Sequence, residues 1–179
     1  MQLGRCSWST LRRSVALSAL AVGLLFSGAS ALGIRVNSSP SLPVGLYQVA
    51  SGADATFVEF CPAEPFASIA NARGYRQAGN CPDGGSPLMK PVVARAGDSV
   101  QVSARGLSVN GKAIPNSAPL PKDTAGRPLT LWPVGTYRVQ PGTVWVVSGY
   151  HPRSFDSRYF GPISEALIRH YLRPLLVLR

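Results

Sequence analysis

Ser41 is the residue whose surroundings best suit a nucleophile. It lies in the segment 37–47 (NSSPSLPVGLY), where Pro40 precedes it and Pro43 follows two residues later. Prolines restrict the backbone, so this serine is held in a fixed pose with its hydroxyl free, as nucleophilic catalysis requires. The same Pro-Ser-Leu-Pro sequence is also typical of a linker, and the segment alone does not decide between the two interpretations.

Lys90 is the lysine best suited to act as a base for such a serine. It lies in apolar sequence (LMKPVV, 88–93), whereas Lys112 and Lys122 lie in polar, turn-like sequence. Burial lowers the pKa of a lysine because desolvation disfavours the charged form, and a neutral amine can accept a proton. An exposed lysine at a strand edge would fit this sequence as well, so both interpretations stay open at this point.

A third polar segment is 154–161 (SFDSRYFG), in which Asp156 and Arg158 would share one face of a strand and form a local ion pair. The only histidines, His151 and His170, are explained as residues at the surface or at a helix end. The sequence contains no HExxH zinc motif, no Walker phosphate loop and no G-x-S-x-G elbow. A hydrolase with this sequence would therefore depend on a lysine base.

The composition is that of a globular domain with an added apolar segment. The 179 residues are 45% hydrophobic and 15% charged, with a net charge of +10 spread along the chain. Such a charge suits an anionic membrane surface or nucleic acid. Because no recognised DNA-binding pattern accompanies the charge, we expect no nucleic-acid partner.

The cysteines favour a disulfide over a metal site. Cys61 and Cys81 can pair if the chain enters an oxidising compartment, and the closed loop of about 20 residues would contribute about 3 kcal/mol. Cys6 lies before the apolar segment. Two cysteines with His151 and His170 far downstream lack the spacing of zinc ligands, so we expect neither a metal nor another cofactor.

The uncharged stretch 15–34 (VALSALAVGLLFSGASALGI) is long enough to span a bilayer as a helix. The arginine pair 12–13 precedes it, and the positive-inside rule then places 1–14 in the cytoplasm and 35–179 outside. The alternative is a cleaved signal peptide, because Ala-Ser-Ala at 29–31 resembles a cleavage site. Either interpretation exports the remainder of the chain.

The rest of the chain predicts a mostly β domain of short strands between turns rich in Pro and Gly. Alternating polar and apolar residues at 98–102 are typical of a half-buried strand, and Asn110-Gly111 predicts a hairpin turn. Strands are expected at 46–50, 56–60, 90–97, 98–104, 106–111, 136–142 and 143–149.

Two short helices are expected in this domain. One lies at 65–75, inside the loop between the cysteines, and the other at 164–172, capped by Ser164 and stopped by Pro174. The segment 116–132 is rich in proline and polar residues and is expected to be an exposed excursion.

Together, and in this order, these segments resemble the signal peptidase (S26) family that uses a Ser–Lys dyad. The resemblance is strongest to its conjugative-transfer branch, the TraF-type peptidases. It implies a signal-peptidase-like β domain with an N-terminal transmembrane helix and a disulfide-closed insert. It covers nearly the whole chain, through 15–34, 37–47, 61–81, 87–100 and 154–163.

The resemblance also implies a role for individual residues. Ser41 matches the nucleophile, Lys90 the general base, and Asp156 the acidic residue that TraF-type enzymes are thought to need. Ser39 falls where relatives place a hydroxyl that assists the oxyanion hole, beside the backbone N–H of Ser41. Asp156 would either position Lys90 or pair with Arg158 to fix the floor of the site.

Two positions depart from the family pattern. Leu42 replaces a common methionine, and both side chains are apolar. Pro91 follows the lysine where arginine is usual, which changes the surroundings of the expected base.

The resemblance implies a membrane-anchored serine endopeptidase that trims, and by attack of the substrate's own amino terminus cyclises, a small exported prepilin. It implies small residues such as Ala before the cut, an inner-membrane location with the catalytic domain in the periplasm, and mating-pore components as further partners. The alternatives are a general signal peptidase that removes leader peptides and a non-enzymatic envelope protein with an exposed Lys90.

Overall fold

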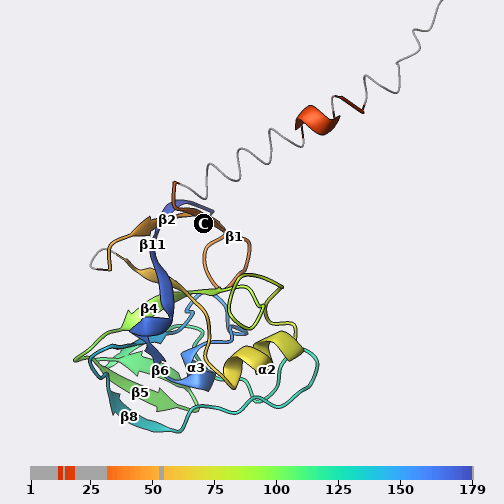
Figure 1. The fold of residues 1–179 in the computed structure, drawn as a ribbon. Helices are drawn as coiled ribbons and strands as arrows, with labels where there is room; N and C mark the ends of the chain where they lie inside the picture. The colour runs from red at the N-terminus through yellow and green to blue at the C-terminus, as the bar shows by residue number, and fades with distance from the viewer. Residues whose placement is uncertain (1–11, 14, 19–31, 53–54, 179) are drawn as a thin grey trace, which may run out of the picture. The chain divides into compact units, whose positions relative to one another are not determined.

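The computed structural model of the chain describes residues 12, 13, 15–18, 32–52 and 55–178 (Figure 1). Residues 1–35 and 36–179 form two separate compact units. In the first unit, 12–13 and 15–18 are helical. Most of the predicted anchor, at 19–31, and Cys6 lie outside the described residues. Among the residues that are described, no helix combines the length and hydropathy that a membrane span needs.

The second unit is built from two sheets. The larger has seven strands in the order β1-β2-β11-β3-β4-β9-β10, and the smaller has four in the order β7-β6-β5-β8. The pairings from β2 to β10, and those of the smaller sheet, are all antiparallel. The predicted mostly β domain is therefore confirmed.

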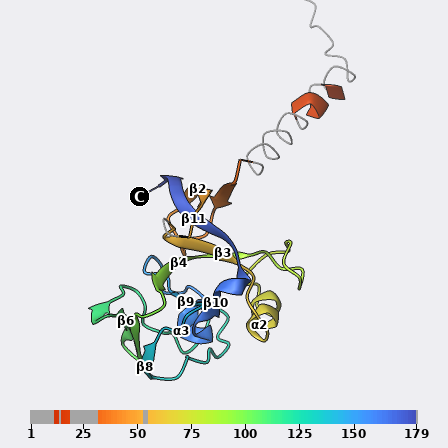
Figure 2. The same ribbon diagram turned by 60° about the vertical axis from the view of Figure 1, so that its left-hand side comes forward.

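The strands of the larger sheet are β1 (Ile34–Asn37), β2 (Gly45–Ala50), β3 (Phe57–Phe60), β4 (Leu88–Ala94), β9 (Thr143–Val146), β10 (Ile163–Ser164) and β11 (Ile168–Val177). Those of the smaller sheet are β5 (Ser99–Ser103), β6 (Gly106–Val109), β7 (Lys112–Ala113) and β8 (Gly135–Arg138). The helical elements are α2 (Phe66–Ala72), α3 (Ser157–Phe160) and the 3-10 turn η1 (Glu165–Leu167). In both views, β2 and β11 lie at one end of this unit and β6 and β8 at the other (Figures 1 and 2).

The hydrophobic core follows from the alternation of side chains along the strands. In β5, Val100 and Val102 are buried while Gln101 between them is exposed, because successive side chains point to opposite faces of a sheet. One core cluster contains side chains of both sheets, with Trp145 from β9 packed among residues that include Val100 and Leu107. The two sheets therefore share a core, to which β4 contributes Ala94 and β9 contributes Trp145.

The predicted hairpin turn at Asn110-Gly111 is confirmed. Both residues have positive φ angles, 50° and 80°, as a type I′ turn requires. The turn joins β6 to β7, whose pairing puts Val109 opposite Lys112.

One of the two predicted helices is confirmed and the other is wrong. Helix α2 lies inside the expected range of 65–75. At 164–172, the Ser164 hydroxyl accepts the N–H of Ala166 and caps only the single turn η1, after which the chain continues as β11. The reason is tertiary: β11 pairs with β2 on one side and β3 on the other, and this pairing overrides the local helical pattern. Pro174 is accommodated at a register shift within β11.

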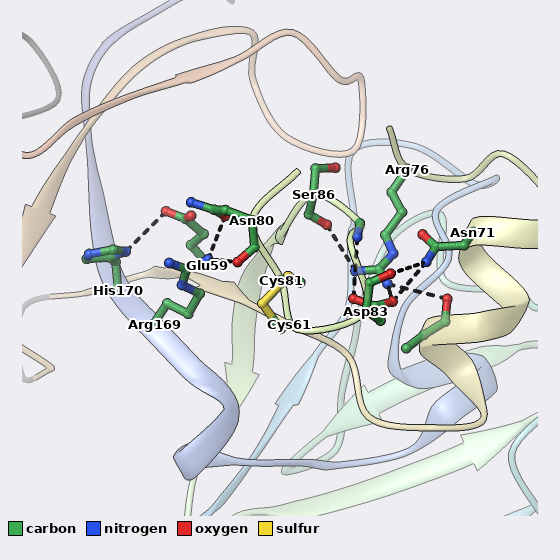
Figure 3. Close-up of a disulfide and its surroundings, with 12 residues drawn as sticks. Glu59, Cys61, Asn71, Arg76, Asn80, Cys81, Asp83, Ser86, Arg169 and His170 are labelled. Carbon is green, nitrogen blue, oxygen red and sulfur yellow. Dashed lines mark hydrogen bonds and ion pairs between the residues drawn. A yellow bond between two sulfur atoms is a disulfide. The ribbon is translucent and has the colours of Figure 1, made fainter. Parts of the chain in front are cut away.

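The predicted disulfide between Cys61 and Cys81 is confirmed (Figure 3). It closes an insert that contains α2 and leads from β3 towards β4. Beyond Cys81, Asp83 accepts a hydrogen bond from Asn71 of α2 at 2.9 Å and forms an ion pair with Arg76. Arg169 of β11 donates to Asn80 at 2.6 Å. The insert is thus held against the sheet at more points than its disulfide.

Candidate active site

A single pocket of about 520 Å³ is lined by both Ser41 and Lys90. Its walls come from the end of β1 and the following turn, from the insert, from the start of β4, from the loop segment 120–129, and from 153–159, which leads into α3. The structure thus brings together two of the predicted site residues that are 49 positions apart in the sequence.

Lys90 lies in β4, opposite Val58 of β3, and only 5% of it is exposed. Since β4 is an inner strand between β3 and β9, the interpretation of an exposed lysine at a strand edge is wrong. Burial lowers the pKa of Lys90 from its ordinary value of 10.5 to about 8, while the charge of Asp156 opposes this shift and that of Arg158 adds to it. A substantial fraction of this amine is therefore neutral at mildly alkaline pH.

The turn that carries Ser41 is organised by Asn37, the last residue of β1. The Asn37 amide donates to the carbonyls of Ser39, Leu42 and Pro43 at 2.8, 3.3 and 3.1 Å, and its oxygen accepts the N–H of Ser39 at 3.1 Å. Leu42 is buried and fixes the other side of the turn. The rigid pose expected of the serine therefore depends on an asparagine that the sequence analysis did not single out, although Asn before Ser-Ser-Pro is typical of an Asx turn.

Ser39 lies beside Ser41, as expected for a pair that binds an oxyanion. Its hydroxyl oxygen accepts the backbone N–H of Ser41 at 3.2 Å. The predicted oxyanion donor therefore already has a partner, and a substrate oxygen would have to take the place of the Ser39 hydroxyl.

Within the part of the chain that the structure describes, the side chains of Ser41 and Lys90 are not hydrogen-bonded to one another. Catalytic hydrogen bonds are often long in ligand-free enzymes and shorten when substrate binds. The geometry therefore places the two side chains in one pocket.

Asp156 caps helix α3 and does not lie on a strand, so the expected shared strand face with Arg158 is wrong, although the ion pair between them is present. Two Arg158 nitrogens donate to the two carboxylate oxygens at 2.8 Å each, and both side chains are fully buried. The remaining guanidinium N–H groups donate to the backbone carbonyls of Asn116, Ser148 and Pro152. A buried pair with this many partners is a fixed part of the fold.

Ser148 connects this ion pair to the nucleophile turn. Its N–H donates to Asp156 Oδ2 at 2.9 Å, and its hydroxyl donates to the backbone carbonyl of Ser41 at 2.7 Å. The side chain is completely buried. The sequence analysis missed Ser148, because the contact spans 107 residues and no local pattern marks it.

Three further polar residues lie outside the lining of the pocket. Ser154 is buried, and its hydroxyl has no hydrogen-bond partner in the described structure. His151 and His170 do not line the pocket. Nδ1 of His170 in β11 lies 3.4 Å from a carboxylate oxygen of Glu59 in β3. Figure 3 shows this pair beside the disulfide.

A β-sheet domain with a serine on a rigid turn and a buried lysine in one pocket has the features of a serine hydrolase that works without histidine. Residues 8–170 match the family described as signal peptidase, peptidase S26. The chain belongs to this family, and that membership makes it a serine peptidase.

Relatives cover most of the chain. A plasmid transfer protein TraF from Escherichia coli is 39% identical over 165 residues, which are 90% of this chain and 93% of the relative. A conjugal transfer protein TraF from Agrobacterium fabrum is 35% identical over 164 residues, 86% of this chain and 90% of the relative. Among solved structures, a signal peptidase I from Enterococcus faecalis covers 70% of this chain and 100% of its own, with a TM-score of 0.38 and 19% identity.

Proposed function

We propose that the protein is a membrane-anchored Ser–Lys endopeptidase that processes a small exported protein, a prepilin, during conjugative transfer. The observation that carries this proposal is the shared pocket of Ser41 and a buried, pKa-lowered Lys90. The TraF relatives, which are named for plasmid and conjugal transfer, support the conjugative context.

In the proposed reaction, neutral Lys90 removes the proton of the Ser41 hydroxyl as Oγ attacks the carbonyl carbon of the scissile peptide bond. The tetrahedral oxyanion is bound by the Ser41 N–H, which exchanges the Ser39 oxygen for the substrate oxygen, and the Ser39 hydroxyl turns to donate a second hydrogen bond. The C–N bond then breaks, and protonated Lys90 returns its proton to the leaving amine.

The acyl-enzyme formed on Ser41 has two fates. Attack by water, with Lys90 again taking the proton, releases a linear carboxylate product. Attack by the substrate's own amino terminus forms a new peptide bond and a circular product. Both routes use the same side chains, so the choice depends on which nucleophile the bound substrate brings to the acyl carbon.

Asp156 acts in this scheme on the nucleophile turn and not as a proton carrier. Its carboxylate is held by Arg158 and by the N–H of Ser148, whose hydroxyl is bonded to the Ser41 carbonyl. Of the two roles considered for Asp156, pairing with Arg158 is the one that hydrogen bonds support. Its charge also raises the pKa of Lys90 and limits the effect of burial.

The proposed location is supported by the sequence and the disulfide together. The apolar stretch 15–34 would anchor the chain in the inner membrane, and a disulfide persists in an oxidising compartment such as the periplasm. We propose that this anchor is retained and that the chain is not cleaved after residues 29–31. Mating-pore components are further proposed partners.

The test is processing of a prepilin by the full chain in membranes, with Ser41→Ala and Lys90→Ala compared with Lys112→Ala, an exposed lysine of β7. We expect both pocket variants to lose processing and Lys112→Ala to keep it. Processing that survives in both pocket variants would refute the dyad. A secreted precursor with an ordinary leader peptide serves as second substrate, and equal processing of both would favour a general signal peptidase.

A further inference from the structure

The disulfide-closed insert and the segment 116–132 form one wall of the same pocket. Tyr75 of the insert, Leu120 and Leu129 of the segment, and Phe155 all line it. We propose that this wall is a substrate subsite for an apolar side chain, with Tyr75 as its contact residue and Asp123 as the residue that positions Tyr75. The proposal rests on the proposed peptidase function.

Asp123 ties the two parts of the wall together. The Tyr75 hydroxyl donates to Asp123 Oδ2 at 2.6 Å, and Nε of Arg127 donates to the same oxygen at 2.7 Å. The other oxygen accepts the N–H groups of Ala125 and Arg127 at 2.9 Å each. The hydrogen bond from Tyr75 is the largest of several that hold the pKa of Asp123 well below its usual range. The Asp123 carboxylate is therefore ionised, and both of its oxygens already accept hydrogen bonds from the protein. We infer that it holds Tyr75 in position and does not bind the substrate.

A second pair of contacts joins the same two segments. Arg73 of the insert donates to the carbonyl of Pro128 at 2.8 Å, and Arg127 donates back to the carbonyl of Arg73 at 3.0 Å. The Arg127 guanidinium also lies 5.7 Å from the centre of the Tyr75 ring. The wall is thus a fixed surface, although the segment 116–132 contains no strand or helix.

The surface that this wall presents is aromatic and continuous with the candidate active site. The Tyr75 ring packs against Phe155 at 5.0 Å between centres, and Phe155 stacks on Tyr159 at 5.8 Å. Tyr159 is anchored in turn, because its hydroxyl oxygen accepts the N–H of Leu120 at 3.0 Å. Phe155 directly precedes Asp156, so the apolar wall and the ion pair below the nucleophile turn share one stretch of chain. A substrate side chain that contacts these rings gains by leaving water, which favours an apolar residue.

Two exposed cations, Lys122 and Arg153, are among the charged residues that line the pocket. An acidic substrate side chain is therefore the competing outcome. The rings of Tyr75, Phe155 and Tyr159 are buried or half-buried, and they favour an apolar side chain. Lys122 and Arg153 are exposed, so water screens their attraction for an acidic side chain.

The experiment measures kcat/KM of the full chain for a set of peptides spanning the scissile bond. At each position in turn, Leu is compared with Ser and with Glu. We expect the wild type to prefer Leu at one position by roughly tenfold or more. Tyr75→Ala should lose that preference through KM while keeping kcat. Asp123→Asn should weaken the preference, since Tyr75 keeps its ring but loses its ionised partner.

Asp98→Asn is the matched control, because Asp98 also organises a loop, accepting the N–H of Arg95 and the amide of Asn110 at 2.8 Å each, but does not line the pocket. It should leave the preference unchanged. Leu129→Ser is the second test should Tyr75→Ala not fold, and it should lower the same preference. An unchanged preference in Tyr75→Ala or Leu129→Ser, or a wild-type preference for Glu at that position, overturns the subsite. A wild type that cleaves none of the peptides contradicts the peptidase function itself.

Discussion

Lys90 is buried in β4, and the charges of Asp156 and Arg158 shift its pKa in opposite directions. Its folded-state pKa of about 8 lies below the ordinary 10.5, so between these values the unfolded chain binds a proton that the folded chain does not. The free energy of unfolding therefore rises as the pH increases from about 8 to 10.5. Below pH 8, Lys90 is charged in both states, and its burial lowers the free energy of unfolding by a constant amount. The same property supplies the neutral amine that a general base needs.

The activity should follow the titration of this amine. We expect kcat/KM to rise with pH and to reach half its maximum near pH 8, because only the neutral form of Lys90 accepts the serine proton. A pH–rate profile on a peptide substrate measures this. A midpoint below pH 7, typical of an unperturbed histidine, would contradict the assignment.

Replacing the base should stabilise the fold. Lys90→Met removes the buried charge and keeps a chain of similar length, so at pH 7 we expect unfolding to require more free energy, by up to about 3 kcal/mol. The gain should vanish at pH values above 10.5, where both states of the wild type are neutral. Urea unfolding at the two pH values measures the difference. If Lys90→Met destabilised the fold equally at both pH values, the burial of the Lys90 charge would not be a cost to the wild type.

Ser148 offers a test of positioning. Ser148→Ala removes the bond to the Ser41 carbonyl and should lower kcat by roughly tenfold or more, with KM and the pH midpoint unchanged because Lys90 is not altered. Ser117→Ala is the matched control and should leave kcat unchanged, since Ser117 is a buried serine whose hydroxyl donates to the carbonyl of Ile114 at 2.6 Å and not to the turn of Ser41. A shifted pH midpoint in Ser148→Ala would instead indicate that the residue acts on Lys90.

At the scale of the element, the sequence predicted those turns and helices whose conformation depends on neighbouring residues in the chain. The turn at Asn110-Gly111 depends on two residues that tolerate positive φ, and α2 lies in a loop whose ends its cysteines bring together. The segment 164–172 was predicted wrongly because its conformation depends on pairing with β2 and β3, which are more than 100 residues away in the sequence. Asp156 was placed on a strand for a different reason, because a helix of four residues is too short to leave a periodic pattern.

The disulfide insert should be a separable contributor to stability. Replacing Cys61 and Cys81 together by alanine should lower the free energy of unfolding by about 3 kcal/mol, through the entropy of the opened loop. Urea unfolding of the variant and of the oxidised wild type measures this difference. The reduced wild type is the control, and its melting temperature should agree with that of the variant. A wild type whose melting temperature does not change on reduction would contradict a stabilising role for the crosslink.

At the scale of the whole molecule, Ser41 follows the apolar segment 15–34 by only seven positions in the sequence. The resemblance of scattered segments predicted that Ser41 and Lys90 belong to one site, and the shared pocket agrees with that expectation. The contacts that assemble the site could not be predicted from the sequence. The hydrogen bonds of Asn37, of Ser148 and between Tyr75 and Asp123 depend on the folded structure, and no spacing of residues along the chain encodes them.

The central claim is that Ser41 carries the acyl group and Lys90 makes it nucleophilic. The most direct measurement is intact-mass analysis of the full chain, quenched within a single turnover on a peptide substrate, followed by peptide mapping of the adduct. We predict an acyl adduct on Ser41 in the wild type and none in Ser41→Ala or Lys90→Met. An adduct on another residue, or peptide cleavage that persists in Ser41→Ala, would contradict the mechanism.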